Sequence, residues 1–151
     1  MSAEKKLAEL NLQLPTPPQP AGAYTRAVIS SNLVFVAGQL PLVEGKIQYA
    51  GTLGVDLDID AGYAAARLCA LNALSILKAE TGDLDALSIV RLGGYVTSAT
   101  DFFEQAQVIN GASDLMAAVL GEQGVHARLA IGAASLPLGA AVELEVIAAI
   151  A

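Results

Sequence analysis

Residues 125–150 read VHARLAIGAASLPLGAAVELEVIAAI, and they decide most of the fold. Apolar residues recur at every second position on both sides of the sequence LPLG at 136–139. Alternation of this period is typical of β-strands, and neighbouring Pro and Gly residues are typical of a turn. The stretch therefore predicts two strands, 125–133 and 141–150, that contribute to one sheet.

The formal charges of this stretch are Arg128, Glu143 and Glu145. Alternation places Leu129 and Ile131 on the face that we expect to pack against the core, and Arg128 on the opposite face. Glu143 and Glu145 share one face of the following strand. If the two strands are neighbours, an arginine and a carboxylate can approach each other across them.

Two interpretations of Arg128 stay open. It is either one half of a structural cross-strand ion pair, or the anchor of a small anionic ligand in an apolar cleft, because its planar guanidinium matches a carboxylate. His126, the one histidine of the chain, is either a general base or a structural side chain beside the arginine.

The other elements follow from hydrophobic periodicity and from Gly, Pro and capping residues. We expect a short helix over 2–12, an extended proline-rich segment over 15–20, strands at 27–29, 33–37 and 46–49, a helix over 60–79, a strand over 87–97 and a helix over 100–120. In the helix over 60–79, Asn72 and Ser75 are expected on the side away from the core. Gly93 and Gly94 indicate a bulge or a close backbone approach. This order predicts one α+β domain, with a mixed sheet that carries two main helices on one face.

Composition excludes several classes of protein. Eight Lys and Arg residues against fifteen Asp and Glu residues give a net charge of −7, which repels nucleic acid and anionic membrane surfaces. Mean hydropathy is high at +0.55, but Pro137, Glu143 and Glu145 interrupt the most apolar stretch, so a membrane span is not expected. We expect the excess apolar surface to be buried between subunits.

Neither a metal nor a cofactor is expected, because no phosphate loop, dinucleotide motif or Cys/His spacing is present. The acidic residues of 56–60 are interpreted as helix caps. Cys69 is the single cysteine, and we expect it to be buried and inert. A lone cysteine and an N-terminus without a signal-like apolar run predict a cytoplasmic protein.

The segment 126–145 resembles the C-terminal signature of the YjgF-type, or RidA-like, family of reactive intermediate deaminases. That signature places an Arg before a Leu-Pro turn and a Val-Glu-x-Glu strand. Three further pieces agree in order: GAYTRAV at 22–28, VAGQLP at 36–41, and Asn110 in the second long helix. The resemblance implies a single chorismate-mutase-like domain over 1–151, with residues 1–21 as an N-terminal extension, assembled as a homotrimer with clefts between subunits.

The resemblance also implies an activity, the hydrolysis of enamines or imines such as 2-aminoacrylate and 2-iminobutyrate to 2-keto acids and ammonia. By position, Arg128 binds the substrate carboxylate and Glu143 positions the water. Tyr24 and Gly38 line the pocket, and Asn110 lies close to it. Placing an anion and a water needs neither a metal nor a covalent nucleophile.

The chain departs from the family pattern at two pocket positions. Ala37 replaces a hydroxyl residue before the Gly-Gln-x-Pro motif, and Ala130 stands where a small polar or thiol side chain follows the family arginine. These losses favour an alternative function, a non-catalytic binder of keto acids or related carboxylate metabolites. An endoribonuclease is the least favoured alternative, because the net charge is −7 and aromatic residues are few.

Overall fold

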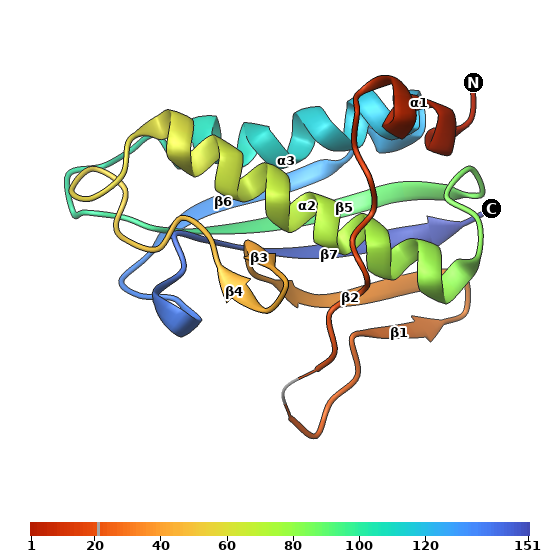
Figure 1. Ribbon diagram of the computed structural model, residues 1–151, viewed down its shortest axis with the longest axis horizontal. Helices are drawn as coiled ribbons and strands as arrows, with labels where there is room; N and C mark the ends of the chain where they lie inside the picture. Colours follow the sequence, from red (N-terminus) through yellow and green to blue (C-terminus); the bar gives the residue numbers. More distant parts are fainter. Residues whose placement is uncertain (21) are drawn as a thin grey trace.

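A five-stranded sheet with the order β1-β2-β7-β5-β6 forms the centre of the molecule (Figure 1). The computed structural model describes residues 1–20 and 22–151. The strands of this sheet are β1 (Ala27–Ser30), β2 (Leu33–Gln39), β5 (Leu87–Thr97), β6 (Ala127–Ala133) and β7 (Val142–Ile150). β5 and β6 pair in parallel and the other neighbours are antiparallel, so the predicted mixed sheet is confirmed. The expected strand at 46–49 is β4 (Lys46–Ile47), which pairs with β3 (Leu42–Val43) in a separate small sheet.

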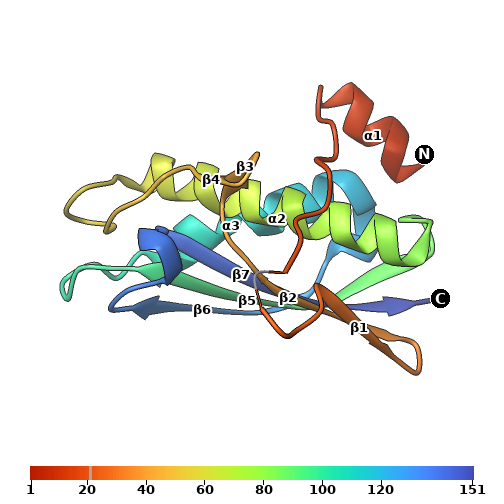
Figure 2. The same cartoon turned by 60° about the horizontal axis from the view of Figure 1, so that its bottom comes forward.

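The helices α2 (Ile59–Thr81) and α3 (Gln105–Leu120) lie together on one face of the sheet (Figure 2), which confirms the expected arrangement. Asp58 caps α2 by accepting a hydrogen bond from the amide of Ala61, and Gly82 ends the helix in the left-handed conformation. The two helices approach closely at Gly111, where a Cβ atom would overlap the backbone oxygen of Tyr63. α3 begins later than predicted, because residues 99–102 form a turn closed by the amide of Phe102 and the carbonyl of Ala99.

The expected exposed side of α2 is wrong at two positions. Asn72 and Ser75 are both buried. Asn72 Nδ2 donates to the carbonyl oxygens of Leu40 and Leu42 at 3.1 Å, and Ser75 Oγ donates to the carbonyl of Asn72 at 2.7 Å. The small β3–β4 sheet therefore covers a second side of α2, and local hydrogen bonds satisfy the polar atoms that become buried there.

The N-terminal helix α1 (Ala3–Glu9) is packed onto the rest of the molecule. Ser2 caps it by accepting a hydrogen bond from the amide of Lys5, and Leu7 is buried in the core. The amide of Ala3 donates to Asp85 Oδ1 at 2.7 Å, and Glu4 pairs with Lys78 of α2. The expected end of the extension, residue 21, lies outside the described residues.

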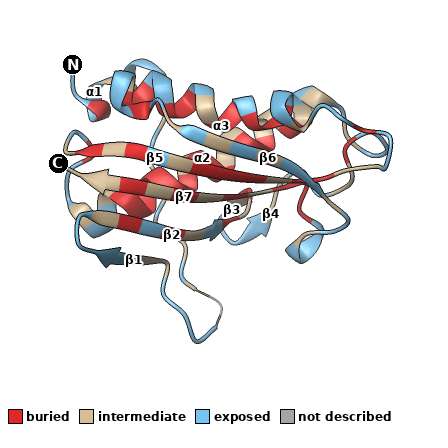
Figure 3. Ribbon diagram, turned by 180° about the vertical axis from the view of Figure 1, so that it is seen from behind, coloured by how far each residue is buried: buried red, intermediate tan, exposed pale blue. Residues whose placement is uncertain are grey.

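The helices leave one face of the sheet uncovered, and parts of its strands are exposed (Figure 3). Some of the exposed side chains are apolar. Leu129 and Ile131 of β6 are 42% and 41% exposed on this face, so the expectation that they pack against the core is wrong. Alternation shows which residues share a face, but the helices decide which face is covered, and they cover the side of Arg128. Phe35 of β2 is similarly exposed. Apolar faces of this kind are typical of surfaces that pack against another chain.

Within the described part of the chain, no helix is both long and apolar enough to cross a membrane.

Candidate functional site

Arg128 lies on β6, and its side chain reaches the neighbouring helix α3. Nη1 donates to Asn110 Oδ1 at 2.8 Å and to Ser113 Oγ at 3.2 Å, and Nη2 donates to the carbonyl oxygen of Ala106 at 3.3 Å. Arg128 pairs across the sheet with Leu92, which is fully buried beneath the helices. The structure thus brings together two residues that the sequence predicts for the site, Arg128 and Asn110.

The positive charge of Arg128 is not neutralised by a carboxylate. Among the residues that the structure describes, none of the ion pairs within 4.0 Å involves Arg128. Its guanidinium is held instead by an amide oxygen, a hydroxyl and a backbone carbonyl. Nε and the second proton of Nη2 have no acceptor in the described ranges. A fixed guanidinium with two unused donors is suited to a two-point contact with a carboxylate.

Glu143 lies on β7, and its carboxylate sits against the backbone of Gly38 on β2. A Cβ atom at position 38 would overlap Glu143 Oε1 and lie 3.1 Å from its Cδ. Glycine is therefore required for this close approach. Burial, with a smaller contribution from the negative charge of Glu145, raises the pKa of Glu143 above its ordinary value. A half-buried carboxylate with a raised pKa is suited to exchanging a proton with water.

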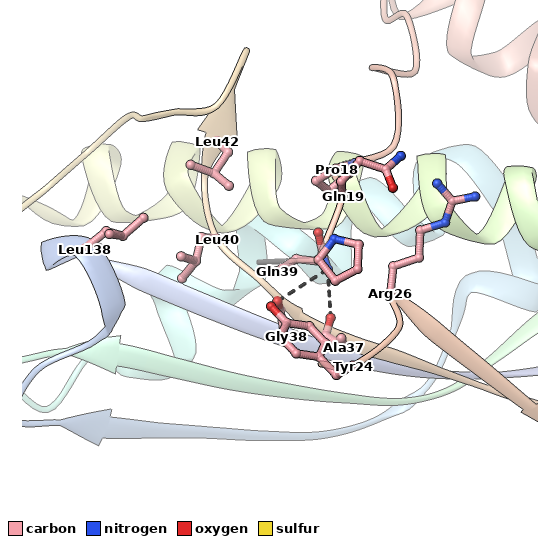
Figure 4. A pocket seen from close by; sticks show the side chains of 11 residues that line it. Pro18, Gln19, Tyr24, Arg26, Ala37, Gly38, Gln39, Leu40, Leu42 and Leu138 are labelled. Atoms are coloured by element: carbon pink, nitrogen blue, oxygen red, sulfur yellow. Dashed lines mark hydrogen bonds between the residues drawn. The ribbon is translucent and has the colours of Figure 1, made fainter. Parts of the chain in front are cut away.

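A cavity of about 150 Å³ opens beside Gly38 (Figure 4). Tyr24 and Gly38, two of the predicted site residues, line it together with Ala37, Leu40 and Leu138. Pro18 and Pro20 of the proline-rich segment complete its wall. Arg26 also borders the cavity, but its Nε binds Glu80 Oε1 at 2.6 Å. The cavity is therefore bordered mainly by apolar groups and backbone, with one arginine whose charge is already paired.

The two groups of site residues do not meet within one chain. β5 lies between β6 and β7, so Arg128 and Glu143 are separated by two strand spacings across the sheet, about 10 Å. They are also offset along the strands, because Arg128 pairs with Leu92 and Glu143 with Tyr95. Glu143 pairs with Tyr95 on the uncovered face of the sheet, whereas Arg128 points to the helix-covered side. The expectation that an arginine and a carboxylate approach each other across adjacent strands is wrong for this pair. A small ligand therefore cannot touch both residues within one chain.

A structural ion pair does exist on the last strand, but with another arginine. Arg91 Nη1 binds Glu145 Oε1 at 2.8 Å, and Tyr95 Oη donates to the same oxygen at 3.2 Å. Gly93 lies against this carboxylate. A Cβ atom at position 93 would lie 2.5 Å from Glu145 Oε1, so a side chain there would overlap it. Arg91 was not predicted as a partner of Glu145, although its position in the strand that contains Gly93 and Gly94 offered a signal.

The remaining candidates have structural surroundings. Cys69 is fully buried in α2, and burial raises the pKa of its thiol well above the ordinary value, in agreement with an inert side chain. Ala130 is half-buried on the same side of β6 as Arg128. In the described ranges, no group of three or more His, Cys, Asp or Glu residues could hold a metal ion.

Comparison with known proteins finds one matching family model and a similar protein from another organism. A family model described as "YjgF/chorismate mutase-like, putative endoribonuclease" matches residues 4–150. Protein TCP17 of Trypanosoma cruzi is 45% identical over 141 residues, which are 92% of this chain and 88% of that protein.

Two solved structures show how closely the fold is shared. A protein of unknown function from Agrobacterium tumefaciens is 46% identical, with a TM-score of 0.93 over 99% of this chain and 92% of that one. RidA from an Antarctic Psychrobacter species is 26% identical, with a TM-score of 0.65 over 91% of this chain and 97% of that one. The chain thus follows the Agrobacterium structure more closely than it follows RidA.

Proposed function

Because this chain belongs to the YjgF/chorismate mutase-like family, we propose that it hydrolyses small 2-imino acids and their enamine forms to 2-keto acids and ammonia. The reaction takes place in clefts between the subunits of a homotrimer. The observation that carries this proposal is the guanidinium of Arg128, which is held by neutral groups and keeps its charge for a ligand. The similarity of the whole chain to RidA supports the same reaction.

The proposed chemistry divides the work between two chains. Arg128 of one subunit binds the substrate carboxylate through Nε and Nη2. Glu143 of a neighbouring subunit accepts a proton from water, whose oxygen adds to the imine carbon. The same proton then passes to the imine nitrogen, which gives a carbinolamine. Glu143 next carries the hydroxyl proton of the carbinolamine to its amino nitrogen. The carbon–nitrogen bond breaks as the carbonyl forms, and ammonia leaves with a 2-keto acid as the second product. The raised pKa of Glu143 supports both halves of this proton transfer.

A non-catalytic binder is the second candidate, and Ala37 and Ala130 favour it because both lack polar groups that could contact a reacting nitrogen. Both functions require Arg128, so ligand binding does not separate them. Ammonia release does: 2-aminoacrylate and 2-iminobutyrate are generated enzymatically, and the protein is added at a catalytic concentration. A deaminase accelerates the release of ammonia over the reaction with water, and a binder leaves it unchanged.

Ribonuclease activity is opposed by the net charge of −7, because an acidic surface repels a phosphate backbone. Affinity for RNA that falls steeply with added salt would revive this candidate.

A further inference from the structure

Behind Arg128, two side chains to which the family resemblance assigns no role form a short series of hydrogen bonds. Ser113 of α3 lies 3.2 Å from Arg128 Nη1 and 2.9 Å from His126 Nε2. His126 precedes β6, and its Nδ1 lies 2.6 Å from the carbonyl oxygen of Gly124. The chain of contacts therefore joins the backbone at Gly124 to the guanidinium.

With a neutral imidazole, donor and acceptor chemistry gives these hydrogen bonds one direction. A carbonyl oxygen only accepts, so Nδ1 of His126 carries the proton. In the neutral imidazole Nε2 then has a free lone pair, and the hydroxyl of Ser113 donates to it. The lone pairs of Ser113 Oγ are left to accept from Arg128, which has only donors. Every contact is satisfied in one arrangement of protons.

We propose that Ser113 and His126 are positioning residues for Arg128, an inference that rests on the proposed function of that arginine. Together with Asn110, Ser113 occupies both protons of Nη1. These contacts prevent the guanidinium from rotating. Nε and the remaining proton of Nη2 are then held where the carboxylate of a ligand can accept from both. Preorganising the donors in this way strengthens carboxylate binding.

Ser113 and His126 differ from the usual partner of an arginine, because neither carries a negative charge. Arg91 is held by the carboxylate of Glu145, which neutralises its charge. Arg128 is held by neutral groups. Asp114 lines the same cavity of about 320 Å³ as Ser113 and His126, but its Oδ2 accepts from Tyr63 Oη at 2.8 Å. The orientation of Arg128 is therefore fixed without loss of the charge that attracts an anion.

The direction of the hydrogen bonds is testable on the wild-type protein without a ligand. His126 is the single histidine, so its two ring nitrogens give unambiguous signals in nitrogen NMR. At pH 8 we expect the tautomer with the proton on Nδ1. The tautomer with the proton on Nε2 would overturn the proposed series of hydrogen bonds.

The effect on Arg128 is tested with Ser113→Ala. The dissociation constant for 2-ketobutyrate, measured by calorimetry, should rise about tenfold, with KM rising equally and kcat changing less than about threefold. Rotation of the guanidinium about Cζ–Nη1, measured by NMR, should become faster. Ser113→Thr keeps the hydroxyl and should restore both values. His126→Phe should weaken binding in the same direction, whereas Ser88→Ala on β5 should have no effect.

A purely structural role predicts something else. Ser113→Ala would then lower the melting temperature and leave the dissociation constant and the guanidinium rotation unchanged, which would overturn the proposal. If the wild-type protein does not bind 2-ketobutyrate, the proposed function fails. The tautomer of His126 and the rotation of Arg128 then decide separately whether the pair holds the arginine, and fast rotation in the wild-type protein would contradict it.

Discussion

Gly38 and Glu143 lie in direct contact across β2 and β7, and the contact leaves no room for a side chain at position 38. The nearest atom to a Cβ there is Glu143 Oε1, the far end of a flexible side chain. A substitution at position 38 is therefore expected to move the carboxylate before it disturbs the sheet.

Gly38→Ala should reduce the deaminase rate by about tenfold to a hundredfold, because a displacement of about 1 Å in a reacting group has costs of this size. The melting temperature should change little. The rate is measured as ammonia release. In a Glu143→Gln background the same alanine should cause no further loss, because the group through which it acts is already disabled. Independent, additive losses would show that Gly38 acts in another way.

Glu143→Gln should lower turnover much more than it lowers keto-acid affinity, because the amide keeps the shape of the carboxylate but cannot accept the proton. It should also stabilise the protein above neutral pH. A carboxyl whose pKa is raised on folding holds its proton more tightly in the folded chain, so stability falls as the pH rises through the raised pKa.

The stability of this variant is measured as a melting temperature at pH 4 and at pH 8. The glutamine protein should melt higher than wild type at pH 8, and the difference should shrink at pH 4, where the wild-type carboxyl is mostly protonated. Equal melting temperatures at both pH values would contradict the burial argument. A parallel loss of affinity and turnover would instead assign Glu143 to holding the ligand.

The dependence of turnover on pH should report on Glu143. As the base it must be ionised, so activity should fall on the acid side at a pH above the usual range of a glutamate. Glu145→Gln removes a negative charge that contributes to this shift, and it leaves Arg91 without its carboxylate partner. Both changes favour ionised Glu143, so the acid limb of the profile should move to lower pH. An unmoved limb would mean that another group controls it.

Arg128→Ala should weaken keto-acid binding by at least about tenfold to a hundredfold while the protein stays folded. The guanidinium makes no ion pair within the described residues, so its removal leaves no buried carboxylate unpaired. A charge-assisted contact with a carboxylate contributes about 1.5–3 kcal/mol, or about tenfold to a hundredfold in affinity. Arg128→Lys should also bind poorly, because an ammonium cannot make the two-point contact. Calorimetry and circular dichroism together distinguish lost binding from lost folding.

The sequence predicted the elements well because their signals are local. Asp58 and Gly82 mark the ends of α2, and the alternation from Val142 to Val146 marks β7. The face that Leu129 presents was predicted wrongly, because alternation gives two faces without saying which one the helices cover.

The contacts that could not be predicted from the sequence are mainly those between distant segments of the chain. The position of β5 between β6 and β7 separates Arg128 from Glu143, and strand order is not encoded in the alternation of either strand. The pairing of Arg91 with Glu145 depends on the same order. Asn72 shows a further limit, because a helix position with a polar residue is buried when a small second sheet covers it. The roles of Arg128 and Glu143 stay predictions.

The most direct test of the account is complementation between two inactive variants. Arg128→Ala and Glu143→Gln chains are mixed in equal amounts under conditions that exchange subunits. If each cleft takes its arginine from one chain and its glutamate from another, about one quarter of the clefts in a cyclic trimer contain both wild-type residues. Ammonia release should recover to about one quarter of the wild-type rate. A mixture no more active than the two variants measured separately would contradict a site shared between subunits.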